Sequence, residues 1–256
     1  MNLQELLHRI RRKLTKLCLQ PIRVFCFHQA SDTYEPDVYC KPDWVPLSFL
    51  QELVKQLQSE GCEFISLTDA YDKIANDRFR NRKYAVLTAD DGLLCHADLL
   101  PWLEEQHIPI TLFVNVKYLD GKSCGGPVKK YFKIETEEEE HIHASRLYCT
   151  EEQIFGLSSP ILSIGMHGIT HDRVTEFSED EFSHQLDVCH EVLSKHPAYI
   201  PFFAYPHGAH SYRIDEIVRK HGFVPVLANG EKNYSDAQVI HREILEYLYK
   251  CQNHQS

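Results

Sequence analysis

The chain has 256 residues, enough for one large domain, and its 43% hydrophobic and 25% charged residues are ordinary for a globular protein. A formal net charge of −10 argues against nucleic-acid binding, which needs a basic surface, and gives no general attraction to anionic membranes. The nine cysteines show no Cys-x-x-Cys spacing and predict free thiols in a reducing compartment. No secretory or membrane-spanning segment is visible, so we expect a cytoplasmic protein.

Residues 1–20 predict an N-terminal amphipathic helix. Leu3, Leu7 and Ile10 recur at spacings of four and three residues, which places them on one helix face. Basic side chains lie beside that apolar stripe, so weak contact with a membrane surface is one interpretation of residues 1–19. Packing against the domain, or self-association with a second copy of the chain, is the interpretation that we prefer.

Residues 21–256 predict a single domain in which strand and helix patterns alternate. Short apolar runs predict buried strands, and the amphipathic segments between them predict helices. Two of these helices begin at capping boxes, which open at Thr150 and Ser178. Such alternation is typical of a parallel sheet or barrel. The expected strands cover residues 22–27, 64–67, 84–87, 110–114, 161–166, 199–203 and 223–227, and the expected helices cover 47–59, 69–76, 94–106, 150–157, 178–195 and 211–220.

The segment 117–149 interrupts this alternation. Gly121, Gly125, Gly126 and Pro127 disfavour regular structure, and a run of four glutamates further on indicates a solvated surface. We therefore expect an inserted loop region at about 117–149. A long loop beside an active face is a common place for substrate selection, and we expect that role here.

Two adjacent carboxylates, Asp90 and Asp91, follow the apolar run 84–87. Like charges this close resist being ionised together, and a metal cation bound to one of them would remove that cost and leave the other as a base. Gly92 allows the backbone to turn sharply and to approach a ligand. Alone, however, Asp-Asp-Gly is also an ordinary turn sequence.

Two further turns support a metal site. His167 and His171 follow the run 161–166, and residues four apart share a face if the segment turns helical, so both imidazoles can bind one metal. The run 199–203 leads into a turn that contains His207. In an α/β barrel the strand ends build the active face, so the three turns together predict one site.

Taken together, these segments resemble the polysaccharide deacetylase family, carbohydrate esterase family 4. That family has a T-F-D-D-G motif, an H-S/T-x-x-H motif and an R-x-P-Y-type loop in this order. This chain has T-A-D-D-G at 88–92, H-G-I-T-H at 167–171 and Y-P-H-G at 205–208. The resemblance covers about residues 22–245 and implies an α/β fold, a distorted (β/α)7-type barrel in a single domain.

The resemblance also implies roles for the residues of the first two motifs. Asp90 would be the catalytic base, and Asp91, His167 and His171 would be the metal ligands. One carboxylate and two imidazoles suit a catalytic metal that keeps open positions for water and substrate. Zinc is the expected cofactor, and iron, cobalt, nickel or manganese can occupy the same ligand set.

The third motif departs from the family pattern. Aligned on Pro206, the usual arginine of the family falls on Ala204 and its aromatic residue on His207. A subgroup with F-A-Y-P-Y-G at this place fits better. The backbone N–H of His207 is the implied oxyanion donor, and such a donor does not depend on the side chain. The missing arginine leaves open which group orients Asp90.

Two histidines are candidates for the general acid. Many family members carry a late L-x-H motif, which His241 matches poorly, and the following Arg242 resembles the L-x-R-x-x-I ending of the subgroup. His28 closes the strand 22–27 and is the rival, since that end of the strand is expected at the active face. Either histidine can equally be a hydrogen-bonded structural residue.

The predicted function is removal of an N-acetyl group from an N-acetylated amino sugar, glycan or precursor by a metal-dependent carbohydrate deacetylase. The expected cytoplasmic location favours a nucleotide- or lipid-linked sugar over a finished polymer. Two alternatives stay open: hydrolysis of another non-peptide C–N bond, and a non-catalytic carbohydrate-binding descendant of the fold. Ala89 and Gly168 depart from the common family pattern and keep the second alternative open, whereas the intact Asp90 and Asp91 argue against it.

Overall fold

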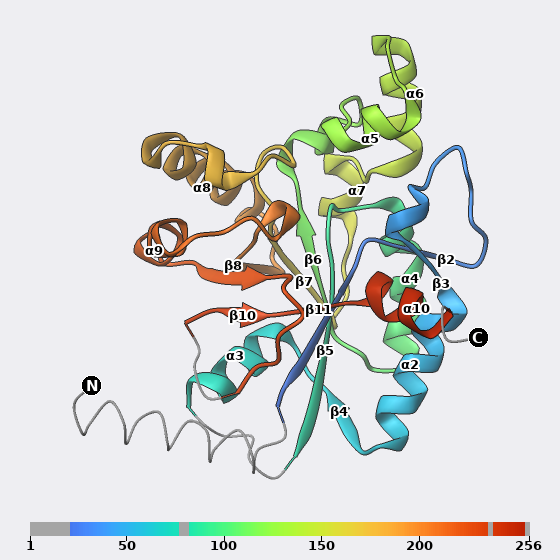
Figure 1. The fold of residues 1–256 in the computed structure, drawn as a ribbon, viewed down its shortest axis with the longest axis vertical. Coiled ribbons are helices and arrows are strands. Elements are labelled where there is room, and N and C mark those ends of the chain that lie inside the picture. The colour runs from blue at the N-terminus through green and yellow to red at the C-terminus, as the bar shows by residue number, and fades with distance from the viewer. Residues whose placement is uncertain (1–20, 77–81, 235–237, 254–256) are drawn as a thin grey trace.

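The computed structural model describes residues 21–76, 82–234 and 238–253, and the helix predicted for residues 1–20 lies outside them (Figure 1). Its strands are short runs of apolar residues, as the sequence patterns indicate. They are β1 (Arg23–Phe27), β2 (Gln29–Ser31), β3 (Trp44–Pro46), β4 (Cys62–Phe64), β5 (Lys83–Ala89), β6 (Ile110–Val114), β7 (Leu162–Met166), β8 (Tyr199–Ala204), β9 (Val224–Leu227), β10 (Ile240–His241) and β11 (Glu243–Ile244).

In the described part of the chain, nine of these strands form one parallel sheet in the order β10-β9-β8-β7-β6-β5-β1-β11, with β4 beside β5. The two ends of this path, β10 and β11, are separated in sequence by Arg242 alone. The sheet is therefore a nearly closed barrel, and the expected distorted (β/α)7-type barrel is confirmed. Strands β2 and β3 pair separately.

Alternate residues of the barrel strands face inward and outward. Val24, Val86 and Phe113 belong to one buried cluster that gathers residues from strands all around the sheet, so this cluster fills the interior. Helix α3 (Leu67–Ala75) contributes to the same cluster and covers one end of the barrel. The outward-facing residues, such as Leu87, join a larger cluster beneath the outer helices.

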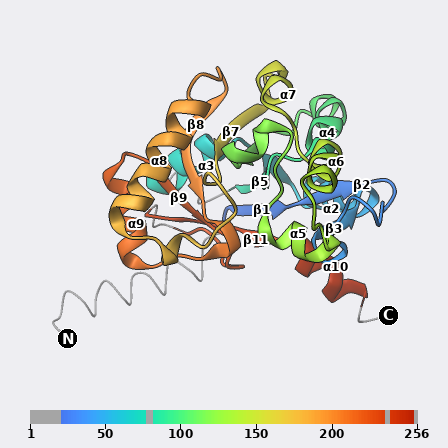
Figure 2. The ribbon, with the colours of Figure 1, turned by 90° about the horizontal axis from the view of Figure 1, so that it is seen from above.

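Helices surround the sheet on its outside (Figure 2). The capping box at Ser178 is present as predicted, because its side chain accepts a hydrogen bond from the N–H of Glu181. The box at Thr150 is formed in the same way. The outer helices are α2 (Leu47–Ser59), α4 (Leu94–Glu105), α7 (Glu151–Gly156), α8 (Glu179–Leu193), α9 (Tyr212–Lys220) and α10 (Leu245–Asn253).

The segment 117–149, expected to be an irregular loop, is largely helical in the structure. It contains the turn η2 (Val116–Asp120) and the helices α5 (Gly126–Phe132) and α6 (Glu137–Leu147). The four glutamates form the first turn of α6, where carboxylates are stabilised by the helix dipole, and Thr136 caps that helix. The segment has its own buried residues, and they pack against the loop before β3.

Two global features follow from the described residues. All eight of their cysteines are free, in agreement with the expectation of unpaired thiols. None of their helices combines the length and the apolar character that crossing a membrane requires.

Candidate metal centre and catalytic site

The turn after β5 holds its two carboxylates in a constrained backbone. Asp91 has φ of 77° and Gly92 has φ of 68°, both in the left-handed region that non-glycine residues rarely adopt. A Cβ atom added to Gly92 would lie 3.1 Å from Val114, so a side chain there would be crowded as well as strained. The strain at Asp91 is of the kind that functional sites store, and it aims the carboxylate toward the histidine motif.

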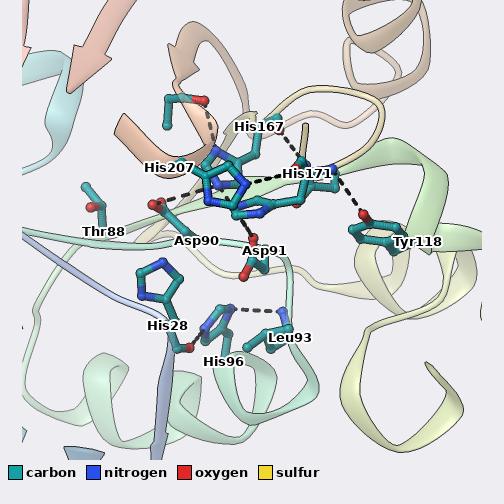
Figure 3. A network of polar contacts seen from close by, with 12 residues as sticks. His28, Thr88, Asp90, Asp91, Leu93, His96, Tyr118, His167, His171 and His207 are labelled. Atoms are coloured by element: carbon teal, nitrogen blue, oxygen red, sulfur yellow. Dashed lines mark hydrogen bonds and ion pairs between the residues drawn. The ribbon is translucent and has the colours of Figure 1, made fainter. Parts of the chain in front are cut away.

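Asp91, His167 and His171 converge as the sequence predicts (Figure 3). Oδ1 of Asp91 lies 3.5 Å from Nε2 of each histidine, and one ligand atom from each residue lies within 4.8 Å of the others. Oδ1 of Asp91 and Nε2 of His167 are buried without a hydrogen-bond partner in the described structure. Buried polar atoms normally have partners, so this arrangement fits a metal ion.

The two imidazoles are held in the form that binds a metal. Nδ1 of His167 donates to the carbonyl of Ala204 at 2.8 Å, which leaves Nε2 as the free acceptor. Burial lowers the pKa of His167 to about 4. Burial, together with the charges of His207 and His28, lowers the pKa of His171 to about 3. Both rings are therefore neutral at physiological pH.

Asp90 is paired with Arg242, which answers the question of what orients it. The guanidinium donates to both carboxylate oxygens, at 2.6 and 2.8 Å, and a further N–H reaches the hydroxyl of Thr88 at 3.1 Å. Both side chains are buried. Burial raises the pKa of Asp90, but the charge of Arg242 and the hydrogen bonds from its guanidinium hold that pKa well below its usual range. Asp90 is therefore ionised.

His28 lies in the same cavity and is paired with Glu246 of α10. Its Nδ1 is 3.0 Å from Oε1 of Glu246, and its backbone N–H donates to the same oxygen at 2.7 Å. Burial alone lowers the pKa of His28, but the charge and hydrogen bond of Glu246 outweigh it and raise that pKa to about 10. The buried ring of His96 donates to the carbonyl of His28 and accepts from the N–H of Leu93, which ties His28 to the Asp-Asp turn.

The other two predicted residues occupy different places. His207 lines the cavity, has φ of 58°, and contacts the carbonyl of His171 through Nε2 at 2.9 Å. His241 is not among the residues that line the cavity, and its Nδ1 pairs with the side chain of Asn229. The structure therefore brings His28, and not His241, to the candidate site.

A single cavity of about 600 Å³ connects these groups. Asp90, Asp91, His167, His171 and His207 line it at the carboxyl ends of the strands, and Figure 3 shows these side chains close together. Other parts of the wall come from α5, α6, α10 and the loop before β3. The segment 117–149 thus contributes to the cavity, as expected of a segment beside the active face.

The fold and the site together define a (β/α)-barrel protein with a candidate metal centre at the carboxyl ends of its strands. The family model for polysaccharide deacetylase matches residues 77–226. The chain therefore belongs to the polysaccharide deacetylase family, as the sequence motifs indicate. No match was found among curated protein sequences.

Solved structures show the same fold. IcaB from Ammonifex degensii is 22% identical, with 88% of this chain and 91% of that chain aligned at a TM-score of 0.68. The Streptococcus pyogenes deacetylase PplD, in complex with acetate, is 16% identical, with 88% and 92% aligned at 0.69. The de-N-acetylase from Aggregatibacter actinomycetemcomitans is 14% identical, with 86% and 93% aligned at 0.66.

Sequence reasoning missed two partners. Glu246, which holds His28, was not singled out, because a glutamate in a late helical segment carries no local sign of a site. Arg242 was noticed as part of a motif ending, but its pairing with Asp90 spans 152 residues. The signal available for both residues was a charged side chain close to a short apolar pair near the end of the chain: Arg242 comes two residues after Ile240, and Glu246 comes directly after Leu245.

Proposed function

We propose that this protein is a metal-dependent carbohydrate deacetylase that removes the N-acetyl group from an amino sugar. One observation carries the proposal. The cluster of Asp91, His167 and His171, which has buried atoms without hydrogen-bond partners, lines the same cavity as Asp90, and Asp90 is an ionised carboxylate that is not one of the three candidate ligands. A sugar-binding protein has no need of a carboxylate held ionised beside a metal triad. Membership of the family supports the assignment.

The residues present fit a divalent transition metal. Asp91, His167 and His171 would hold it, and zinc suits this oxygen and nitrogen donor set best. A metal bound there supplies Lewis acidity, which polarises the amide carbonyl and lowers the pKa of water.

Asp90 is the proposed general base. Its low pKa keeps it ionised, and Arg242 holds both of its oxygens so that the carboxylate cannot rotate away from the cavity. A base of this kind accepts the proton of the attacking water. Arg242 thus supplies the orientation that the family arginine, absent at Ala204, would otherwise give.

His28 is the proposed general acid. Glu246 keeps its ring protonated at neutral pH, so His28 can give a proton to the leaving amine. The backbone N–H of His207, in a left-handed turn at the cavity, is the proposed oxyanion donor.

The test is a combined assay of metal content and of acetate release from an N-acetylglucosamine oligomer, on protein purified without chelators. We expect about one transition metal per chain, lost in Asp91→Asn and in His171→Ala and retained in His184→Ala, a matched exposed histidine on α8. We expect Asp90→Asn to retain the metal and to lose at least about 100-fold in kcat.

Other outcomes of this test would favour one of the two alternative functions. A well-folded, metal-free wild-type protein would contradict the proposed mechanism and favour a sugar-binding role. Metal binding with hydrolysis of other non-peptide amides, and none of N-acetyl sugars, would favour the broader class of C–N hydrolases.

A further inference from the structure

An exposed aromatic ring stands at the rim of the catalytic cavity. Of the four large hydrophobic side chains that are exposed in the described residues, only Tyr247 lines this cavity, and it is 62% exposed. The ring of an exposed tyrosine is not packed in a hydrophobic core, and it provides a flat apolar surface with a polar edge.

The position of Tyr247 relative to the catalytic groups is fixed by α10. The preceding residue, Glu246, is buried and holds His28. One turn later, Nζ of Lys250 donates to the carbonyl of Pro42 at 2.8 Å and lies 5.8 Å from the centre of the Tyr247 ring. The helix is therefore tied on one side to the proposed acid and on the other to the loop before β3.

That loop contributes a carboxylate to the same cavity. Asp43 follows Pro42, is half-buried and lines the cavity; within the described residues its side chain makes no hydrogen bond or close ion pair, and the charges of His28 and Lys250 act on it from further away. Burial raises its pKa. A half-buried carboxylate that accepts no hydrogen bond is unfavourable in the free protein, and a ligand that donates hydrogen bonds to it relieves that cost.

We propose that Tyr247 and Asp43 form a binding subsite for a second pyranose ring, next to the sugar whose acetyl group is removed. This inference rests on the proposed function. The apolar C–H face of a pyranose stacks on an aromatic ring, and its hydroxyl groups donate hydrogen bonds to a carboxylate. A neutral oligosaccharide fits this subsite, because Asp43 would repel a carboxylate or phosphate on a ring bound beside it.

The experiment compares three acetylated probes: a small aryl acetate, monomeric N-acetylglucosamine and a β-linked N-acetylglucosamine pentamer. Tyr247→Ala is expected to raise KM for the pentamer roughly three- to tenfold and to leave the aryl acetate unchanged. Tyr247→Phe, which keeps the ring, should stay within about twofold of wild type. Tyr212→Ala is the matched control, since Tyr212 is exposed but does not line the cavity.

Asp43→Ala is expected to raise KM for the pentamer, whereas Asp37→Ala, an exposed aspartate away from the cavity, should not. Equal pentamer KM values for wild type and both cavity variants would overturn the subsite. Direct binding of the pentamer, measured by calorimetry, separates the two proposals. If the wild-type protein cleaves none of the probes, the proposed function fails. Even then, weaker pentamer binding by Tyr247→Ala than by Tyr212→Ala supports the subsite, and equal Kd values for the two variants refute it.

Discussion

His28 shows how one neighbour decides the chemistry of a residue. Burial by itself favours the neutral ring, and Glu246 reverses that preference, so that the pKa rises to about 10. Because this pKa lies above the ordinary value, the pair contributes stability that is fully present below pH about 6.5 and is lost as the pH rises through about 10. Neutral solutions therefore contain the protonated ring.

Glu246→Gln removes the charge that protonates His28. We expect the pKa of His28 to fall, because burial is then opposed only by the charges of Asp91 and Asp90, so that kcat at pH 8 drops and recovers toward acid pH. The measurement is the pH profile of kcat, with Glu243→Gln as a control on the neighbouring strand. An unchanged alkaline limb would exclude His28 as the acid.

At the scale of single residues, the sequence motifs predicted which side chains form the candidate metal centre. Asp91, His167 and His171 lie directly after strands, and the strand ends of a parallel barrel meet on one face, so their convergence could be predicted. The choice between His28 and His241 could not, because it depends on which side chains of α10 and of the loop after β9 come next to them in space.

Arg242, the single residue between β10 and β11, completes the barrel. The N–H of Arg242 donates to the carbonyl of Leu227 on β9, and its own carbonyl accepts from Gly230. Its side chain enters the interior, where the guanidinium lies 5.1 Å from the ring centre of Phe113 and binds Asp90. The residue that closes the sheet thus also orients the proposed base.

Arg242→Lys tests that dual role. A lysine cannot make the two parallel hydrogen bonds, so we expect Asp90 to lose its fixed orientation and its pKa to rise, which moves the acid limb of the kcat profile to higher pH. Arg23→Lys is the matched control, because Arg23 forms a similar forked pair with Glu243 on the adjacent strand. Identical profiles in both variants would contradict the positioning role.

Among the elements, helices with a clear apolar stripe were predicted well: α2 shows the stripe alone, and α8 shows it together with a capping box. Helix α6 was missed because its first turn is a run of four glutamates and only three of its residues are buried. Thr136 and Glu139 form a capping box that indicates a helix start in the sequence, but the glycines before it favoured the prediction of a loop.

The whole molecule is stabilised by whatever occupies the candidate metal centre, because a ligand that binds only the folded state shifts the unfolding equilibrium. At a free zinc concentration about 100-fold above Kd, we expect about 2.7 kcal/mol of added stability, or a rise in Tm of roughly 5–10 °C. A chelator should reverse the rise. His171→Ala should abolish it and His184→Ala should preserve it; the same rise in all three proteins would mean that zinc binds elsewhere.

The barrel as a whole was predictable because strand and helix patterns alternate over most of the chain. Its closure was not predictable, since β10 and β11 have two residues each and carry no periodic pattern. These short strands form because β9 and β1 offer unpaired edges, which is a property of the assembled sheet.

The single-residue closure also sets an order of assembly during synthesis. The metal triad is complete in the chain once His171 has been made, whereas Asp90 must wait for Arg242, 152 residues after it. Arg242 follows His171 by 71 residues (242 − 171), and at about 5–20 residues per second that interval is roughly 4–14 s. All three proposed metal ligands of a growing chain are therefore present before the proposed base can be oriented, and the proposed active site is complete only once Arg242 has been made.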